Sequence, residues 1–354
     1  MSVYGIPQIG VNKLQKILNY NSFGVSKQIR EGKADWMKPY FSHYSIFESY
    51  DKFGLNLNPV YDRSGAIPHY LNMADIHPMP APDMNYNRSF YEVAKERAIE
   101  LLQENSPINV CWSGGIDSTF VLCILSEVVP ADWITVYGTY ASIIESGDIF
   151  DKFIKNKFKT RINIFPSQEV KTKVEYGIWV TGFQGNQLFG PTDNFFSSNR
   201  EVAFFHHTLG TKETIYEDYR KHIDPELLEF LQPAIDRSPR KIETVADLRW
   251  YCIFNFDWYN GKYAMMNEMN IPKILSVRHF FDTEEFQKWA INTSEPWTKV
   301  RGNPNTHRWQ MRELIADYGM VEYAKNKSKA VSCFTSEPID WCFLLEDYTN
   351  VYSR

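Results

Sequence analysis

The sequence is poor in the features that mark several common protein classes. Its five cysteines are scattered, odd in number and without a CxxC pair, which argues against a disulfide framework and against a zinc site. No hydrophobic run approaches the length of a membrane span, and the N-terminus lacks the charged start and apolar stretch of a signal peptide. We therefore expect a cytoplasmic protein with no membrane partner.

Charge of one sign is not in excess either. The 38 Lys and Arg residues are interspersed with 43 Asp and Glu residues, so the formal net charge of the 354 residues is −5. Without a basic stripe, a nucleic-acid partner is not expected. The chain is 44% hydrophobic, which suits one large domain or two of moderate size.

The adjacent glycines Gly114 and Gly115 are not part of a GxxxxGK[ST] phosphate loop, because no lysine follows them directly. The stretch CWSGGIDSTF, residues 111–120, follows a short β-rich segment and precedes an apolar segment of helical spacing. Gly114 and Gly115 can take positive φ and leave room for a ligand to approach the backbone. Because the first N–H groups of the following helix lack intrahelical partners, this turn predicts an anion site.

Three side chains of the turn fit a polyphosphate. Ser113 and Ser118 supply hydroxyl donors, and the carboxylate of Asp117 can hold a phosphate-bound magnesium ion. The alternative interpretation is a glycine turn that only connects a strand to a helix.

Strand-like and helix-like patterns alternate through the middle of the chain. This alternation predicts an α/β fold with a doubly wound parallel sheet, in which ligands bind beyond the carboxyl ends of the strands. Beyond residue 205 the patterns are mostly helical, and we interpret the aromatic residues crowded into 250–259 as core rather than as a base-stacking platform. The expected elements are a helix opened by the capping box of Ser89 and Glu92, strands at 108–112, 133–138, 161–165 and 177–182, and helices from 117 and near 147–157.

The six residues SGGIDS, 113–118, resemble the SGGxDS pyrophosphate loop of the ATP-pyrophosphatase superfamily. The resemblance implies that ATP is cleaved between its α and β phosphates and that the substrate is activated as an adenylate. ATP and Mg²⁺ are the implied cofactors, with Asp117 at the metal. The implied ATP-binding residues are Ser113, Gly114, Gly115, Asp117, Ser118, Tyr137, Gly138 and Gly182.

Three later stretches are similar, in order, to the synthetase domain of asparagine synthetase. They are TGFQGNQLFG (181–190), SVRHFFDTEEF (276–286) and RWQMRELIADYGMVEYAKNKSKA (308–330). This resemblance implies one such domain over residues 89–354, preceded by an N-terminal extension and linker over 1–88. It also implies catalytic roles for Lys327 and Arg278.

Both of those residues have alternative interpretations. Lys327 lies in a lysine cluster that is typical of a solvated loop. Arg278 can instead form a structural ion pair with Asp282, anchoring a helix that starts there.

The chain also departs from the family. Phe183 stands where asparagine synthetase has a glutamate, and Asn186 and Gln187 replace two acidic residues. Ser2 stands where the glutamine-hydrolysing domain begins with cysteine, so glutamine hydrolysis in the same chain is not expected. The amine is then free ammonia, another small amine, or ammonia from a separate subunit.

The leading hypothesis is an ATP-dependent ligase that joins a small-molecule carboxylate to ammonia or an amine, as a monomer or as a homo-oligomer. A ligase that modifies a nucleobase or nucleotide shares the same loop. A nucleotide-binding pseudoenzyme is the alternative of another class, and the replacements at Phe183, Asn186 and Gln187 favour it.

Overall fold

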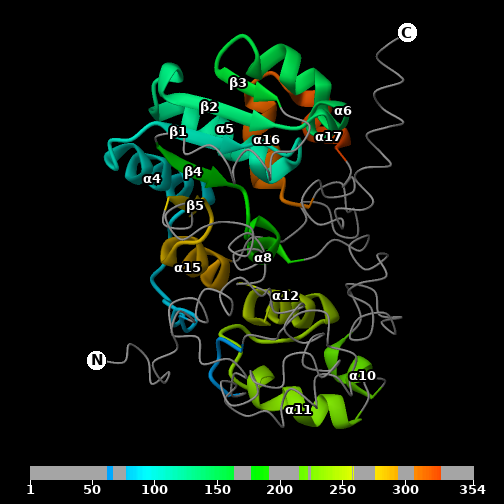
Figure 1. The fold of residues 1–354 in the computed structure, drawn as a ribbon. Coiled ribbons are helices and arrows are strands. Elements are labelled where there is room, and N and C mark those ends of the chain that lie inside the picture. Colours follow the sequence, from blue (N-terminus) through cyan, green and yellow to red (C-terminus); the bar gives the residue numbers. More distant parts are fainter. Residues whose placement is uncertain are drawn as a thin grey trace, which may run out of the picture. The chain divides into compact units, whose positions relative to one another are not determined.

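The chain divides into two compact units in the computed structural model (Figure 1). We call them the sheet unit, from 89–183, 271–280 and 298–354, and the helical unit, from 1–88, 184–270 and 281–297. The residues that the structure describes are 62–66, 77–162, 177–190, 215–221, 225–256, 258, 276–293 and 307–327.

The sheet unit is built on a five-stranded sheet in which all paired strands are parallel, in the order β3-β2-β1-β4-β5. The α/β class with a parallel sheet is therefore confirmed. The chain adds β2 and β3 on one side of β1, and then β4 and β5 on the other. The carboxyl ends of β1 and β4 thus flank the point where the winding reverses, which is where open parallel sheets bind ligands. The strands are β1 (Ile108–Cys111), β2 (Ile134–Gly138), β3 (Lys159–Ile162), β4 (Ile178–Thr181) and β5 (Val277–His279).

The interior strands β1 and β4 are mostly apolar because helices cover the faces of parallel sheets. Ile108 and Val110 of β1 are fully buried, and all four residues of β4 are buried. The edge strand β3 instead alternates exposed and half-buried residues. These patterns fit central and edge positions.

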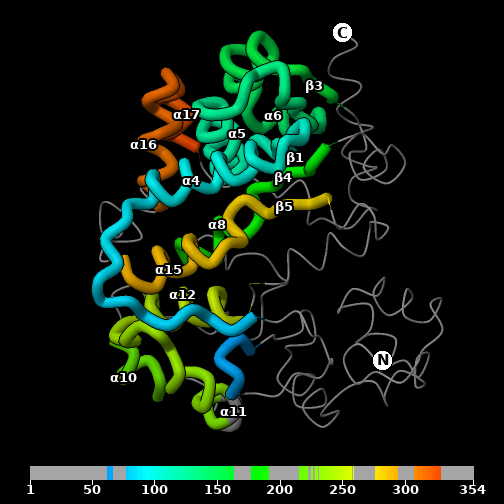
Figure 2. The backbone as a smooth tube through the Cα atoms, turned by 90° about the vertical axis from the view of Figure 1, so that its left-hand side faces the viewer, coloured from blue at the N-terminus to red at the C-terminus, as the bar shows by residue number. Residues whose placement is uncertain are grey.

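The helices of the sheet unit pack against one another as well as against the sheet. Helices α4 and α16 both pack against α5, and α17 packs against α16 and touches α6 (Figure 2). The capping box that the sequence predicts for α4 is present, with Ser89 and Glu92 each bonding the other's backbone N–H. The helices are α4 (Phe90–Gln103), α5 (Ile116–Val128), α6 (Tyr140–Ile149), α16 (Trp309–Asp317) and α17 (Val321–Asn326), with a 3₁₀ turn η3 (Ala131–Trp133) and a π-helical turn η4 (Phe150–Ile154).

Two predicted elements begin two or more residues away from their predicted start, and the bounds of the others differ by no more than one residue. The helix expected near 147–157 begins earlier, at Tyr140, because Thr139 and Ser142 form a capping box directly after β2. The strand expected at 161–165 begins at Lys159 and is described to Ile162, so residues 163–165 lie outside the described part.

The described core of the helical unit is aromatic, as predicted. Trp250, Tyr251, Phe254 and Trp258 are almost completely buried. The Trp250 and Phe254 rings stack with centroids 4.9 Å apart, which is core packing. Tyr259 lies outside the described residues. The helices are α8 (Gly185–Phe189), α10 (Tyr216–Arg220), α11 (Pro225–Ile235), α12 (Val245–Phe256) and α15 (Glu284–Asn292).

A short N-terminal stretch belongs to this helical core. Arg63 is buried, donates to the carbonyl of Phe254 at 2.9 Å, and lies over the Trp258 ring. Asn255 of α12 donates to the Asp62 carboxylate at 2.8 Å. The division of the chain into an extension at 1–88 and a domain at 89–354 stays a prediction.

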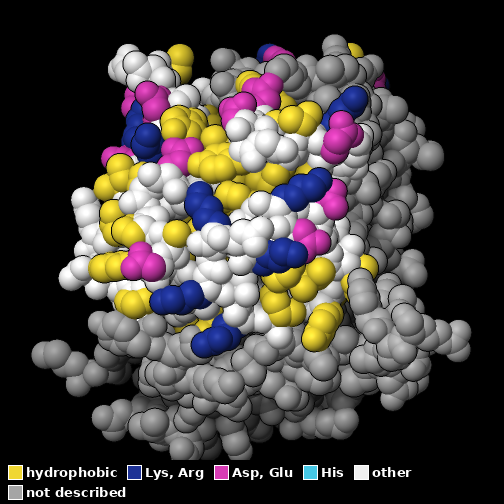
Figure 3. All heavy atoms as spheres, turned by 90° about the horizontal axis from the view of Figure 1, so that it is seen from above, with side chains coloured by type: hydrophobic (Ala, Val, Ile, Leu, Met, Phe, Trp, Pro, Cys, Tyr) yellow, Lys and Arg dark blue, Asp and Glu magenta, His cyan; other side chains and the backbone are white. Residues whose placement is uncertain are grey.

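Among the residues that the structure describes, no helix has both the length and the apolar character needed to cross a membrane. On the face shown in Figure 3, acidic and basic side chains are interspersed among apolar ones.

Candidate functional site

The glycine turn lies between β1 and α5, and its two glycines have different conformations. Gly114 has φ +79°, the left-handed region that glycine adopts without strain. Gly115 is the N-cap of α5 with φ −80° and ψ 166°, an extended conformation open to other residues. Only the first glycine therefore takes the positive φ that the sequence suggested for both.

The space around the glycines also differs. A Cβ atom on Gly114 would lie 2.7 Å from the backbone oxygen of Ser142, so α6 occupies the room that its missing side chain leaves. Among the described residues, a Cβ atom on Gly115 would meet the Ser113 Oγ alone, at 3.4 Å. A ligand can thus approach the backbone at Gly115 rather than at Gly114.

The two serines of the turn hold it together from within. The Ser118 hydroxyl accepts from the backbone N–H of Ser113 at 3.1 Å and donates to the carbonyl of Gly115 at 3.2 Å. The Ser113 and Ser118 hydroxyls are also 3.1 Å apart. Both predicted phosphate donors therefore already shape the turn.

The first turn of α5 keeps an anion-binding character. Among the described residues no side chain caps its N-terminus, so its first N–H groups remain oriented as donors. Asp117, in this first turn, forms an ion pair with Arg308, the N-cap of α16. Arg308 itself has φ 58°, and its buried Nε atom has no hydrogen-bond partner among the described residues.

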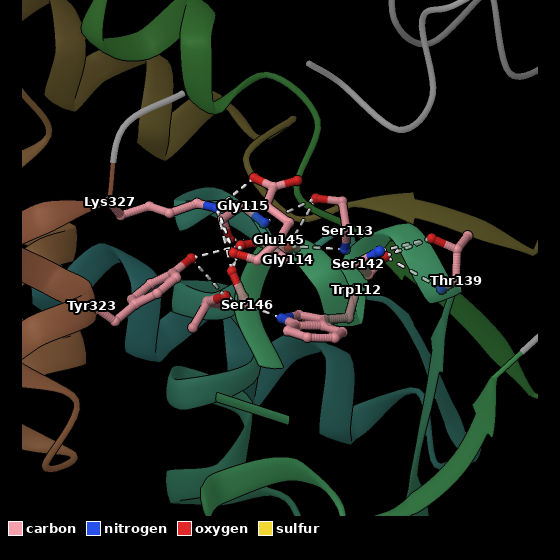
Figure 4. A network of polar contacts seen from close by, with 12 residues as sticks. Trp112, Ser113, Gly114, Gly115, Thr139, Ser142, Glu145, Ser146, Tyr323 and Lys327 are labelled. Atoms are coloured by element: carbon pink, nitrogen blue, oxygen red, sulfur yellow. Dashed lines mark hydrogen bonds and ion pairs between the residues drawn. The ribbon is translucent and has the colours of Figure 1, made fainter. Parts of the chain in front are cut away.

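Lys327 reaches the turn from the end of α17 (Figure 4). Its ammonium lies 2.6 Å from a carboxylate oxygen of Glu145 and 3.3 Å from the Ser146 Oγ. The Ser146 hydroxyl in turn donates to the carbonyl of Gly114 at 2.7 Å. One hydroxyl therefore links the predicted catalytic lysine to the turn, and the Lys327 side chain is only 9% exposed rather than solvated.

Tyr323 makes a second contact from α17 to the turn. Its hydroxyl donates to the carbonyl of Gly114 at 2.8 Å and lies 3.2 Å from the Thr119 hydroxyl. Burial raises the pKa of the Tyr323 phenol well above its usual range, so it remains a hydrogen-bond donor. Thr119 also accepts from the Trp112 indole at 3.1 Å. Hydrogen bonds from Tyr323 of α17 therefore hold the turn in place.

Arg312 fixes the segment that carries Lys327. Its guanidinium donates to the backbone oxygens of His307 at 2.8 Å, Ala324 at 2.5 Å and Lys327 at 2.9 Å. Burial lowers the pKa of this guanidinium from its ordinary value. Arg312 therefore ties α16 to the carbonyl end of α17.

The structure does not bring Arg278 into this cluster. Two nitrogen atoms of its guanidinium donate to Glu104, with Nε and Nη2 each 2.9 Å from a carboxylate oxygen. The alternative ion pair with Asp282 also stays a prediction, and Asp282 accepts from the Trp258 indole at 2.8 Å. The expected helix begins at Glu284 with Thr283 as its N-cap, not at Asp282. A catalytic role for Arg278 stays a prediction.

The remaining predicted ATP-binding residues lie at carboxyl ends of strands. Gly182 follows β4, and a Cβ atom there would be 2.8 Å from the backbone nitrogen of Ser118, so this glycine lets the strand end approach α5. Tyr137 is buried against Trp179, and its carbonyl accepts from the backbone N–H of Trp112 at 2.8 Å. Gly138 ends β2.

The residues that depart from the asparagine synthetase pattern fall in different units. Phe183, in the sheet unit, packs edge-on against His279 with ring centroids 5.6 Å apart. The Nδ1 atom of His279 is 2.7 Å from the Thr181 hydroxyl. Asn186 and Gln187 lie in α8 of the helical unit.

Sequence reasoning missed the carboxylate and hydroxyl that engage Lys327. Glu145 and Ser146 belong to α6, for which a later start was expected, and nothing in their local pattern marks them. Arg308 and Tyr323 lie in the stretch 308–330 that resembles asparagine synthetase, but nothing in the sequence distinguishes them from their neighbours. Only the capping spacing of Thr139 and Ser142 could have shown that α6 begins early enough to cover the turn.

The side chains at the turn show whether a magnesium ion would fit there. Among the described residues there is no group of three or more His, Cys, Asp or Glu side chains suited to a metal. Magnesium that arrives with phosphates needs only one or two protein carboxylates, so Asp117 suits this use. The residues present therefore fit a metal carried by a nucleotide.

The chain matches no protein-family model, and a search among curated proteins gives no match to it.

Proposed function

We propose that the protein is an ATP-dependent ligase of the ATP-pyrophosphatase type, with a doubly wound sheet and the SGGIDS turn as its pyrophosphate site. A small-molecule carboxylate attacks the α-phosphorus of ATP, pyrophosphate leaves, and ammonia or an amine takes the acyl group and releases AMP. Magnesium supplies charge neutralisation on the phosphates when it is bound.

One observation carries the proposal: Lys327 lies beside the turn although about 200 residues separate them in sequence. Its Nζ atom is 3.3 Å from the Ser146 Oγ, which bonds Gly114. A cation here faces the position that an anion on the α5 N-terminus would occupy. Fixed donors and a fixed cation around a phosphate are the electrostatic preorganisation that phosphoryl and adenylyl transfer require.

Each residue then has a distinct task. The backbone around Gly115 and the first N–H groups of α5 bind phosphate oxygens. Asp117, once released from its ion pair with Arg308, would hold the metal that accompanies the phosphates. Lys327 neutralises charge that develops as pyrophosphate departs. Tyr323 and Ser146 keep the carbonyl of Gly114 turned away from the phosphates by donating to it.

The replacement Lys327→Ala tests the proposal. The variant should bind ATP and lose about 10² to 10³ in the rate of pyrophosphate release, because a positioned charge at the reacting group is gone. Release is measured with a panel of small carboxylates and ammonia. The matched control is Lys325→Ala, which removes an exposed lysine of the same short helix and should leave the rate unchanged.

The alternatives give other results. Equal small losses in both variants would show that the lysines act only as surface charge. A wild-type protein that binds ATP but releases no pyrophosphate with any carboxylate would favour the pseudoenzyme. Phe183, whose ring packs against His279, is consistent with that alternative. Pyrophosphate release that depends on a nucleobase or nucleotide instead would favour the modifying ligase.

A further inference from the structure

All the hydrogen-bonding capacity of the Lys327 ammonium is directed at two residues of α6. An ammonium has three donors. Its Nζ atom lies 2.6 Å from a carboxylate oxygen of Glu145, 3.2 Å from the Glu145 carbonyl and 3.3 Å from the Ser146 hydroxyl. The two paired side chains are only 9% and 12% exposed, so water screens the pair poorly.

The backbone of α6 is distorted where it makes these contacts. Ser146 has φ −152° and ψ 50°, which is not helical, although helix continues on both sides. Its hydroxyl bonds the carbonyl of Gly114, and the Glu145 Cβ lies 3.3 Å from the position of a Cβ on Gly114. The kink thus holds the Glu145 carboxylate next to the glycine turn, as Figure 4 shows.

A carboxylate beside an anion site is a competitor for its cation. We propose that Glu145 is a resident counter-ion of Lys327 that a phosphate group of the ligand displaces; this inference rests on the proposed function. Two anions on one poorly solvated ammonium repel each other strongly, so the carboxylate must move away when phosphate binds. Ser146 and the Glu145 carbonyl are neutral and can keep their bonds to the ammonium during this exchange.

The exchange makes the site selective for ligands of high charge. A singly charged ligand gains little by replacing a carboxylate that is already bound at 2.6 Å. Pyrophosphate or the polyphosphate of a nucleotide carries more charge and also reaches the α5 N-terminus. Glu145 therefore sets a threshold against small monoanions such as acetate.

The replacement Glu145→Gln removes the competing charge and nearly preserves the shape of the side chain. Titration calorimetry with inorganic pyrophosphate should show binding at least about tenfold tighter than in the wild type, because a poorly solvated cation without its counter-ion favours any incoming anion. Acetate, which the wild type excludes, should become a measurable competitor.

The matched control is Asp151→Asn. Asp151 forms an ion pair of the same length, 2.6 Å, with Lys155, but both side chains are well exposed at 61% and 48%. This control removes the same unit of charge from the next turn of the chain. It should change pyrophosphate affinity by less than about twofold, since exposed pairs contribute little.

The outcomes separate the two proposals. Unchanged or weaker pyrophosphate binding in Glu145→Gln, with binding in the wild type intact, overturns the displacement and leaves the proposed function standing. No pyrophosphate binding in either protein overturns both. If Glu145→Gln does not fold, Glu145→Asp withdraws the carboxylate by one methylene and should tighten pyrophosphate binding by a smaller factor; equal affinity in that variant counts against the displacement.

Discussion

Gly114 and Gly115 are adjacent and identical in chemistry, yet the structure needs them for different reasons. Gly114 combines a left-handed backbone with a close approach of α6, whereas Gly115 has an ordinary extended backbone and room for a Cβ atom at 3.4 Å from the Ser113 Oγ. The sequence predicted flexibility at the pair, but only the fold distinguishes a glycine required for packing from one that leaves an approach to a ligand.

This difference predicts unequal effects on stability. Gly114→Ala places a Cβ atom 2.7 Å from a backbone oxygen in a strained φ region, and should lower the free energy of unfolding by more than about 2 kcal/mol. Gly115→Ala should cost under about 1 kcal/mol, as an alanine at an N-cap does. Urea denaturation followed by tryptophan fluorescence measures both. Equal costs would show that α6 does not pack on the turn as described.

At the scale of single elements, the start of α4 was the best predicted feature. The Ser89 and Glu92 spacing predicted a capping box, and the structure contains it. Ser89→Ala should therefore destabilise the protein by about 1 kcal/mol, because the N–H of Glu92 loses its acceptor. Ser89→Asp keeps an acceptor at the same place and should be nearly neutral. Thermal unfolding compares the two, and similar losses would indicate that the cap is not formed in solution.

The path of α6 was the least predictable element, for a physical reason. Its start is marked by the local spacing of Thr139 and Ser142, but its kink is not local. Ser146 leaves helical geometry where its hydroxyl bonds Gly114, a residue 32 positions earlier. A local sequence pattern does not predict a hydrogen bond to a distant carbonyl. Neither the kink nor the contact of Glu145 with Lys327 could therefore be predicted.

At the scale of the whole molecule, the alternation of patterns predicted parallel strands but not their order. The order β3-β2-β1-β4-β5 sets the carboxyl end of β1, with its glycine turn, next to that of β4, with Gly182. Strand order depends on which apolar faces the helices cover, and short apolar strands carry little information about their neighbours. The turn was therefore predictable from local sequence, and its surroundings were not.

Buried thiols in both units predict a loss of stability in alkali. Burial raises the pKa of the Cys123 thiol in the sheet unit and of the Cys252 thiol in the helical unit, from an ordinary value of 9.0. Above about pH 9 the unfolded chain then releases protons that the folded chain retains. Stability that is fully present below pH 9 should fall as the pH rises, by about 1.4 kcal/mol per pH unit for each thiol.

Urea denaturation at pH 8, 9, 10 and 10.5 measures this fall. Cys123→Ala creates a small cavity and lowers stability at every pH, but it also removes one of the titrating groups. Its curve against pH should therefore be shallower than that of the wild type by about 1.4 kcal/mol per unit above pH 9. Parallel curves for the two proteins would mean that the Cys123 thiol ionises as readily in the folded chain as in the unfolded one, which would contradict its burial on α5.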